Sequence, residues 1–129
     1  MEESMKKRFQ GAENALAKLH EGVTKESLTE MERDGLIQRF EFAFEIMWKC
    51  GKDYLLDREG LEAASPKKVI RNLREVGLFT DEEAEMALQM ADDRNLTAHT
   101  YDEKMAMALS ERIIVYEKLL AEWLGRMKA

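Results

Sequence analysis

Apolar residues recur at alternating intervals of three and four positions along most of this chain. The first such run consists of Met5, Phe9, Ala12, Leu16 and Leu19. This spacing places side chains on one face of an α-helix, whereas no segment shows the sustained alternation of a half-buried strand. With one proline and seven glycines, the chain also has little material for the many turns of a sandwich or barrel. The sequence therefore predicts an all-α fold.

Five helices are expected, over residues of about 2–20, 29–55, 66–76, 80–93 and 100–128. Four of these helices begin at a capping signal: Thr29 with Glu32, Thr80 with Glu83 and Thr100 with Glu103 match capping boxes, and Ser65 precedes Pro66. The third and fourth helices are short and would form a hairpin between the second and the last. We expect one domain over residues 1–129, an antiparallel up-and-down bundle of long helices with a short helical hairpin.

The second helix is apolar on two sides. Its main stripe contains Ile37, Phe40, Phe44, Met47, Gly51 and Tyr54. At 100° per residue, Phe42 and Ile46 fall on the opposite side. Such a helix is either buried on both sides or meets a partner, although isolated exposed apolar residues are also common. We favour a subunit contact and therefore a homodimer.

The charge of the chain limits the kind of nucleic-acid site that it can carry. A net charge of −6 argues against a broad electrostatic grip on nucleic acid, and leaves room only for a local site that holds one or two phosphates. No apolar run approaches the roughly 20 residues of a membrane span, so no membrane contact is expected. The acidic start, Met1 to Ser4, does not resemble a secretion signal, and we expect a cytoplasmic protein.

The octapeptide Arg94 to Tyr101, with the sequence RNLTAHTY, carries most of the functional information. It combines a permanent cation, the imidazole of His99 and the phenol of Tyr101 within one predicted connection. A guanidinium can hold a phosphate through its fixed fork of donors, and a neutral imidazole can exchange a proton near pH 7. These two groups are the minimum set for binding or cleaving a phosphodiester. The free N–H groups at the start of the last helix would add a seat for phosphate.

Each of these residues also has a purely structural interpretation. Arginine at a helix end often caps carbonyls or pairs with a carboxylate, and Asp92 and Asp93 are adjacent. A lone histidine near a helix start is more often structural than catalytic. Asn95 and Thr97 could merely satisfy the turn, and Tyr101 could be a half-buried aromatic residue. The combination of these residues within eight positions favours a functional site.

Two other kinds of site have less support. Asp92, Asp93, His99 and Asp102 could hold a metal ion, but no pair of ligands at helical spacing of the zinc type supports this, and we expect no metal. Cys50 is the single cysteine, so it forms no disulfide within the chain, and no histidine lies near it in sequence to activate it.

The spacing Arg94-x4-His99-x-Tyr101 matches the R-x4-H-x-Y signature of the HEPN toxins, small helical bundles paired with MNT nucleotidyltransferase antitoxins. Three longer segments resemble the nucleotidyltransferase substrate-binding branch of that family. They are RFEFAFE at 39–45 with Trp48-Lys49 following, SPKKVI at 65–70, and DRNLTAHTY at 93–101. The resemblance covers about residues 35–118, most of the chain.

The resemblance implies a metal-independent ribonuclease without a cofactor, whose arginine and histidine line a cleft between two subunits. Arg94 would clamp the scissile phosphate and stabilise its growing negative charge. His99 would act as general base or acid while the RNA 2′-OH attacks the phosphorus. Asn95 and Thr97 are the expected substrate-binding residues.

Tyr101 would be the control point, because the partner nucleotidyltransferases of such pairs resemble enzymes that transfer AMP to this tyrosine. The chain itself lacks the glycine-serine and paired-aspartate features of a nucleotidyltransferase. Two hypotheses therefore remain: a toxin ribonuclease neutralised by its partner, or a non-catalytic subunit that binds a substrate or nucleotide for that partner. A structural scaffold without a ligand is a more distant third.

Overall fold

The structure is a computed structural model that describes residues 2–99 and 102–129. Its elements are α1 (Glu2–Val23), α2 (Glu30–Glu59), α3 (Pro66–Glu75), α4 (Asp81–Leu96), a short 3₁₀ helix η1 (Thr97–His99) and α5 (Glu103–Lys128). No strand occurs in these two described ranges. The predicted all-α fold with five helices is therefore confirmed.

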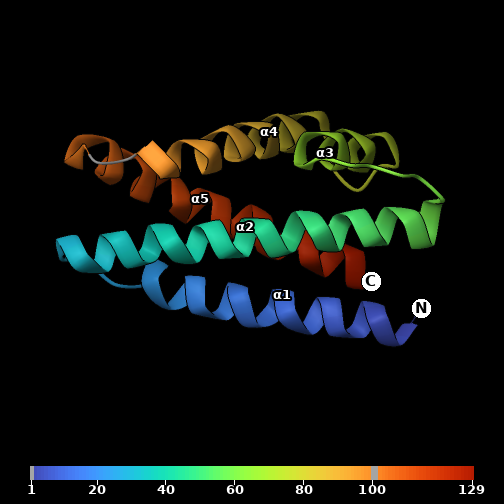
Figure 1. Cartoon of the computed structure of the whole chain (residues 1–129), viewed down its shortest axis with the longest axis horizontal. Coiled ribbons are helices and arrows are strands. Elements are labelled where there is room, and N and C mark those ends of the chain that lie inside the picture. Colours follow the sequence, from blue (N-terminus) through green and yellow to red (C-terminus); the bar gives the residue numbers. More distant parts are fainter. Residues whose placement is uncertain (1, 100–101) are drawn as a thin grey trace.

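Helix α2 lies at the centre of the bundle and packs against all four other α-helices (Figure 1). Helices α1 and α2 are antiparallel, as are α4 and α5. Helices α2 and α5 run in the same direction, because the α3–α4 hairpin returns the chain to the end at which α2 began. This route brings the end of α4, with Arg94, alongside α2.

The inward positions predicted from the spacing form the core. On α5, Leu109, Ile113, Tyr116, Leu120 and Trp123 are all buried. At Gly51 of α2, an added Cβ would lie 2.9 Å from Val69 Cγ1 and 3.1 Å from Trp123 Cζ2. The missing side chain therefore allows α2 to approach α3 and α5 closely.

Three of the four predicted helix starts are confirmed. Thr29 and Thr80 each form a complete capping box with the glutamate three residues later, and the Ser65 hydroxyl caps α3 ahead of Pro66. The fourth is wrong. Helix α5 begins at Glu103, and the Asp102 carboxylate caps it by accepting from the Lys104 N–H at 2.9 Å. The predicted cap, Thr100, lies outside the described residues.

Two helix ends also lie beyond their predicted positions. Helix α1 continues to Val23, so its connection to α2 is shorter than expected. Helix α4 continues to Leu96, which places Arg94 and Asn95 in its last turn and not in a free connection. The two side chains are thus held by regular helix geometry.

The second apolar side of α2 is partly exposed, and the subunit contact expected there stays a prediction. Phe42 is 59% exposed, while Ile46 is half-buried and packs against the core. Within the part of the chain that the structure describes, no helix combines the length and the apolar character needed to cross a membrane.

Candidate functional site

Arg94 and Asn95 line a hollow with a volume of about 390 Å³, which we call the Arg94 hollow. Its other lining residues include Glu45 and Trp48 of α2, Ser65 and Pro66 at the start of α3, and Lys67 in the first turn of α3. The hollow therefore joins all three sequence segments that carry the family resemblance, although the segments are far apart in the chain.

Sequence reasoning placed Arg94 and Asn95 in the site but missed Glu45, Trp48 and Lys67. A signal for them was present. Glu45 and Trp48 are three residues apart and so share a helix face, and Lys67 occupies the first turn of a helix that begins at a clear capping signal. The spacing alone does not show that Glu45, Trp48 and Lys67 lie close together beside the end of α4.

The guanidinium of Arg94 is only loosely engaged. Its Nη2 lies 3.8 Å from Glu45 Oε2, and its side chain is 32% exposed. The buried Nε has no hydrogen-bond partner among the described residues. A half-exposed ion pair of this length contributes at most about 1 kcal/mol. Arg94 therefore keeps donors available for an anion.

Neither neighbouring aspartate pairs with Arg94. Its carboxylate partner is Glu45 of α2, so the structural interpretation holds in part, with a different acidic residue. Asp92 pairs with Lys67 at 2.6 Å. Asp93 is buried and accepts from Arg112 Nε at 2.8 Å, from Arg112 Nη2 at 3.2 Å and from the Tyr116 hydroxyl. Two of the four candidate metal ligands are thus already paired with cations.

The Asp93 contacts fix the end of α4 against α5. Burial raises the pKa of the Tyr116 phenol above its usual range, and the hydrogen bond to the Asp93 carboxylate acts in the same direction. The phenol therefore stays protonated and continues to donate. Since Asp93 precedes Arg94 directly, this network holds the turn from which Arg94 extends.

The remaining predicted residues lie just beyond this turn. The Thr97 hydroxyl donates to the Arg94 carbonyl at 2.7 Å, so Thr97 helps to close the end of α4, as its structural interpretation expected. The His99 backbone ends η1, but the His99 side chain and the whole of Tyr101 lie outside the described residues. Because Asp102 already occupies the Lys104 N–H, the start of α5 is less open to phosphate than predicted.

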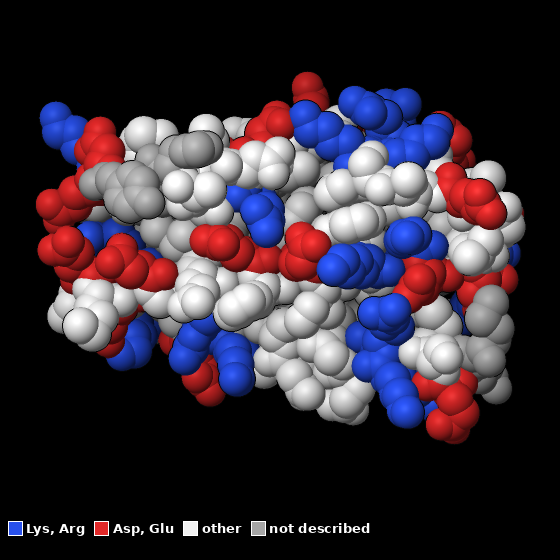
Figure 2. All heavy atoms as spheres, in the orientation of Figure 1, with Lys and Arg blue, Asp and Glu red and all other residues white. Residues whose placement is uncertain are grey.

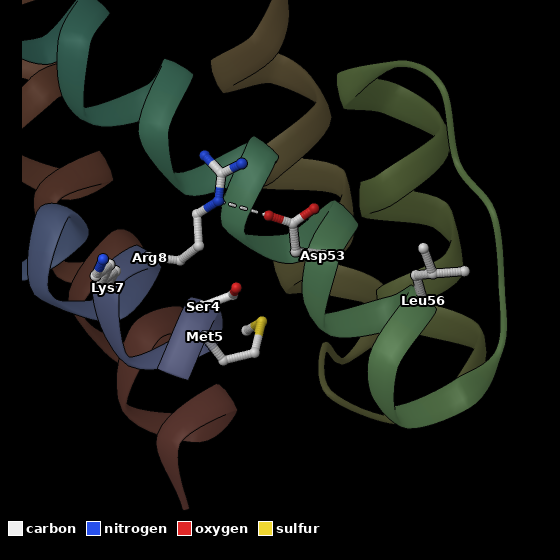
Figure 3. A pocket seen from close by; sticks show the side chains of 6 residues that line it. All are labelled: Ser4, Met5, Lys7, Arg8, Asp53 and Leu56. Carbon is white, nitrogen blue, oxygen red and sulfur yellow. Dashed lines mark ion pairs between the residues drawn. The ribbon is translucent and has the colours of Figure 1, made fainter. Parts of the chain in front are cut away.

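A larger hollow, of about 550 Å³, lies between the first turns of α1 and the last turns of α2 (Figure 3). Figure 3 shows Arg8 pointing toward Asp53, and its Nε lies 2.7 Å from Asp53 Oδ2. The guanidinium of Arg8 is thus paired more closely than that of Arg94. None of the predicted site residues lines this hollow.

Charged residues of both signs are interspersed over the molecular face in Figure 2, and no broad basic area covers it. This distribution agrees with the net charge of −6. On this face, a phosphate would have to be held by a few local cations.

Comparison with known proteins identifies the family. Residues 7–129 match the family described as "Nucleotidyltransferase substrate binding protein like". Over 83 residues the chain is 35% identical to "Probable ribonuclease HepT" of Haemophilus influenzae, in a match that covers 61% of this chain and 56% of that relative. The match thus spans little more than half of the curated relative's length.

A protein from Thermus thermophilus, known from its crystal structure, is similar to this chain in both sequence and fold. The two chains are 52% identical and superpose with a TM-score of 0.89, over 92% of this chain and 99% of the other. The family match covers nearly the whole chain and includes the three segments that meet at the Arg94 hollow. The chain therefore belongs to the nucleotidyltransferase substrate-binding family, as its motifs predicted.

Proposed function

We propose that this protein is a HEPN-type toxin, a metal-independent endoribonuclease that a partner nucleotidyltransferase neutralises. The observation that carries the proposal is the state of Arg94, which lines a hollow and is held only by an ion pair of 3.8 Å. His99 follows five residues later in the chain. The similarity to a protein named as a ribonuclease supports the same chemistry.

In the proposed reaction, Arg94 binds the scissile phosphate and stabilises the charge that grows on its oxygens. The RNA 2′-oxygen attacks the phosphorus and loses its proton to a general base, while the bond to the 5′-oxygen breaks and that oxygen gains a proton. His99 supplies one of these two proton transfers. Asn95, which lines the hollow, orients the phosphate or the ribose, and Thr97 holds the turn between Arg94 and His99.

A homodimer would complete the site. Each chain carries a net charge of −6, so a single copy attracts RNA poorly. Two copies of Arg94 and His99 that face one cleft would concentrate positive charge where the phosphate binds. The exposed Phe42 on α2 offers such a dimer an apolar contact.

We expect the protein to slow bacterial growth when it is expressed alone, and growth to recover when a nucleotidyltransferase of the MNT type is expressed with it. The purified protein should cleave single-stranded RNA in the presence of a chelator, because no step of the reaction uses a metal. Growth curves and gel analysis of the RNA measure the two effects. Absence of both effects would leave the endoribonuclease proposal without support.

Control by AMP transfer gives a separate prediction. Incubation with such a partner and ATP should add an AMP-sized mass to the chain, and Tyr101→Phe should remove the addition. The added phosphate and nucleoside would obstruct RNA by bulk and by charge near the site. Peptide mass spectrometry locates the addition, with Tyr54→Phe as the control for a tyrosine elsewhere. An addition that persists in Tyr101→Phe shows that the target residue is another one.

A second candidate function is a non-catalytic subunit that binds a nucleotide for the partner enzyme. The observation that favours it is the placement of Glu45 beside Arg94 and of Asp92 beside Lys67, because these carboxylates weaken the local attraction for RNA. Under this alternative the protein binds the partner and its nucleotide, but neither slows growth nor cleaves RNA.

A further inference from the structure

The wall of the Arg94 hollow contains the flat apolar surfaces that a nucleobase needs. Trp48, Pro66 and the buried Phe44 line it, beside the charged side chains of Glu45 and Arg94. Its volume of about 390 Å³ lies within the range of roughly 300–1,000 Å³ that is typical of small-molecule sites. Two larger hollows, one beside Arg8 and one beside His20, have no tryptophan or phenylalanine in their walls.

Two hydrogen-bond donors of this wall have no acceptor. Three buried side-chain nitrogens in the described part of the chain lack a partner, and two of them, Arg94 Nε and Trp48 Nε1, belong to residues that line the hollow. The third belongs to Trp123, which is fully buried in the core. An unpaired buried donor is unfavourable, so two residues of this wall carry a hydrogen-bonding capacity that no described residue satisfies.

The charges of the hollow suit a nucleotide phosphate. Arg94 and Lys67 contribute two cations. Arg94 is paired loosely, at 3.8 Å, with Glu45 of the same hollow, and Lys67 pairs at 2.6 Å with the exposed Asp92, which does not line it. The first turn of α3 contains no acidic residue, so the positive end of that helix adds to the attraction. The carboxylate of Glu45 can accept from a base N–H or from a ribose hydroxyl.

We propose that the Arg94 hollow is a subsite for one ribonucleotide, with its base against Trp48 and its phosphate on Arg94 and Lys67. This inference rests on the proposed function in one respect only: in the ribonuclease, the nucleotide is the one beside the scissile bond. Free nucleoside monophosphates present the same chemistry. They bind the same subsite and compete with RNA for it.

The two tryptophans of the chain provide a direct test. Adenosine 3′-monophosphate should quench the emission of Trp48, because the base stacks on its ring, while ribose 5-phosphate, which lacks a base, should quench little. Trp48→Phe should abolish the quench, because the remaining Trp123 is fully buried. Trp48→Leu should weaken binding of the nucleotide about ten-fold or more, the usual scale for loss of a stacking ring, as measured by calorimetry.

Two controls separate the subsite from stability. Helix content, measured by circular dichroism, should be preserved in both Trp48 variants. Met31 lies on the same helix, is 83% exposed and does not line the hollow. Met31→Ala should therefore leave nucleotide binding unchanged.

The inference and the proposed function can fail separately. If the wild type cleaves RNA but binds ribose 5-phosphate as tightly as the nucleotide, or if Trp48→Leu binds the nucleotide unchanged, the subsite is refuted and the ribonuclease stands. If the nucleotide quenches Trp48 but no RNA is cleaved, the subsite stands and the ribonuclease does not. Where both stand, the nucleotide inhibits RNA cleavage competitively, with an inhibition constant that rises in Trp48→Leu.

Discussion

Arg94→Ala or His99→Ala is expected to abolish the growth inhibition by this protein and to lower kcat/KM for RNA cleavage by orders of magnitude. Removal of one group that stabilises the developing charge typically costs about 10²–10³-fold in rate. Removal of a general acid or base costs about 10²–10⁴-fold. Cleavage of a defined RNA by purified wild type and variants, followed on denaturing gels, measures both losses.

Arg94→Lys separates the charge of this residue from its geometry. The lysine keeps the positive charge but replaces the planar fork of donors by a single ammonium group. We expect activity between those of the wild type and Arg94→Ala, because part of the attraction for phosphate remains. Activity equal to that of Arg94→Ala would mean that paired hydrogen bonds, more than net charge, hold the phosphate.

Arg71→Ala is the matched control, because Arg71 is an exposed arginine of α3 that does not line the Arg94 hollow. It changes the net charge by the same amount as Arg94→Ala and should leave cleavage nearly unchanged. Equal losses in Arg71→Ala and Arg94→Ala would show that RNA responds to overall charge and not to a built site. Full activity in Arg94→Ala would remove this residue from the mechanism.

The helix starts were predictable where the capping chemistry is local and has no competitor. Thr29 and Thr80 each have the glutamate three residues later that completes a capping box, and both boxes form. Thr100 with Glu103 shows the same spacing, yet Asp102 caps α5. Aspartate and threonine are both good caps, so the pattern alone could not choose between two caps that are two residues apart.

The end of α4 shows a different limit. The run Asp92-Asp93-Arg94-Asn95 is fully polar and predicts a helix end at Asp93, but α4 continues to Leu96. The reason is tertiary packing. Asp93 is buried and accepts hydrogen bonds from Arg112 and Tyr116 of α5, which lie 19 and 23 residues away in the sequence. Likewise, the sequence motifs contain Glu45, Trp48 and Lys67 but did not identify them as site residues, because only the packing of α2, α3 and α4 brings them to Arg94.

Asp93→Ala is expected to cause the largest loss of stability among polar substitutions near the site. The change leaves the buried Tyr116 hydroxyl without its acceptor and Arg112 without its carboxylate. Breaking a buried pair by removing one partner costs about 3–5 kcal/mol, and the lower end applies because the Arg112 side chain is 39% exposed. For a chain of this size, that corresponds to a fall in Tm of roughly 10 °C, measured by circular dichroism.

Asp92→Ala is the control for this prediction, because Asp92 is the preceding residue and its side chain is 60% exposed. Its ion pair with Lys67 lies at the surface, so the expected loss is below about 1 kcal/mol. Tyr116→Phe removes only the hydroxyl and should cost about 1 kcal/mol, since the ring and its stacking on Phe40 remain. Equal stability of Asp93→Ala and Asp92→Ala would contradict the proposed role of the buried carboxylate.

The Asp93 variants also test whether the buried network serves the site. At a temperature at which Asp93→Ala is still folded, a network that merely stabilises the bundle leaves kcat/KM for RNA unchanged. If the network orients Arg94, Asp93→Ala lowers kcat/KM, because Arg94 extends from the turn that Asp93 holds against α5. We expect the second result, with a smaller loss than in Arg94→Ala, since the guanidinium is still present and only its orientation becomes less defined.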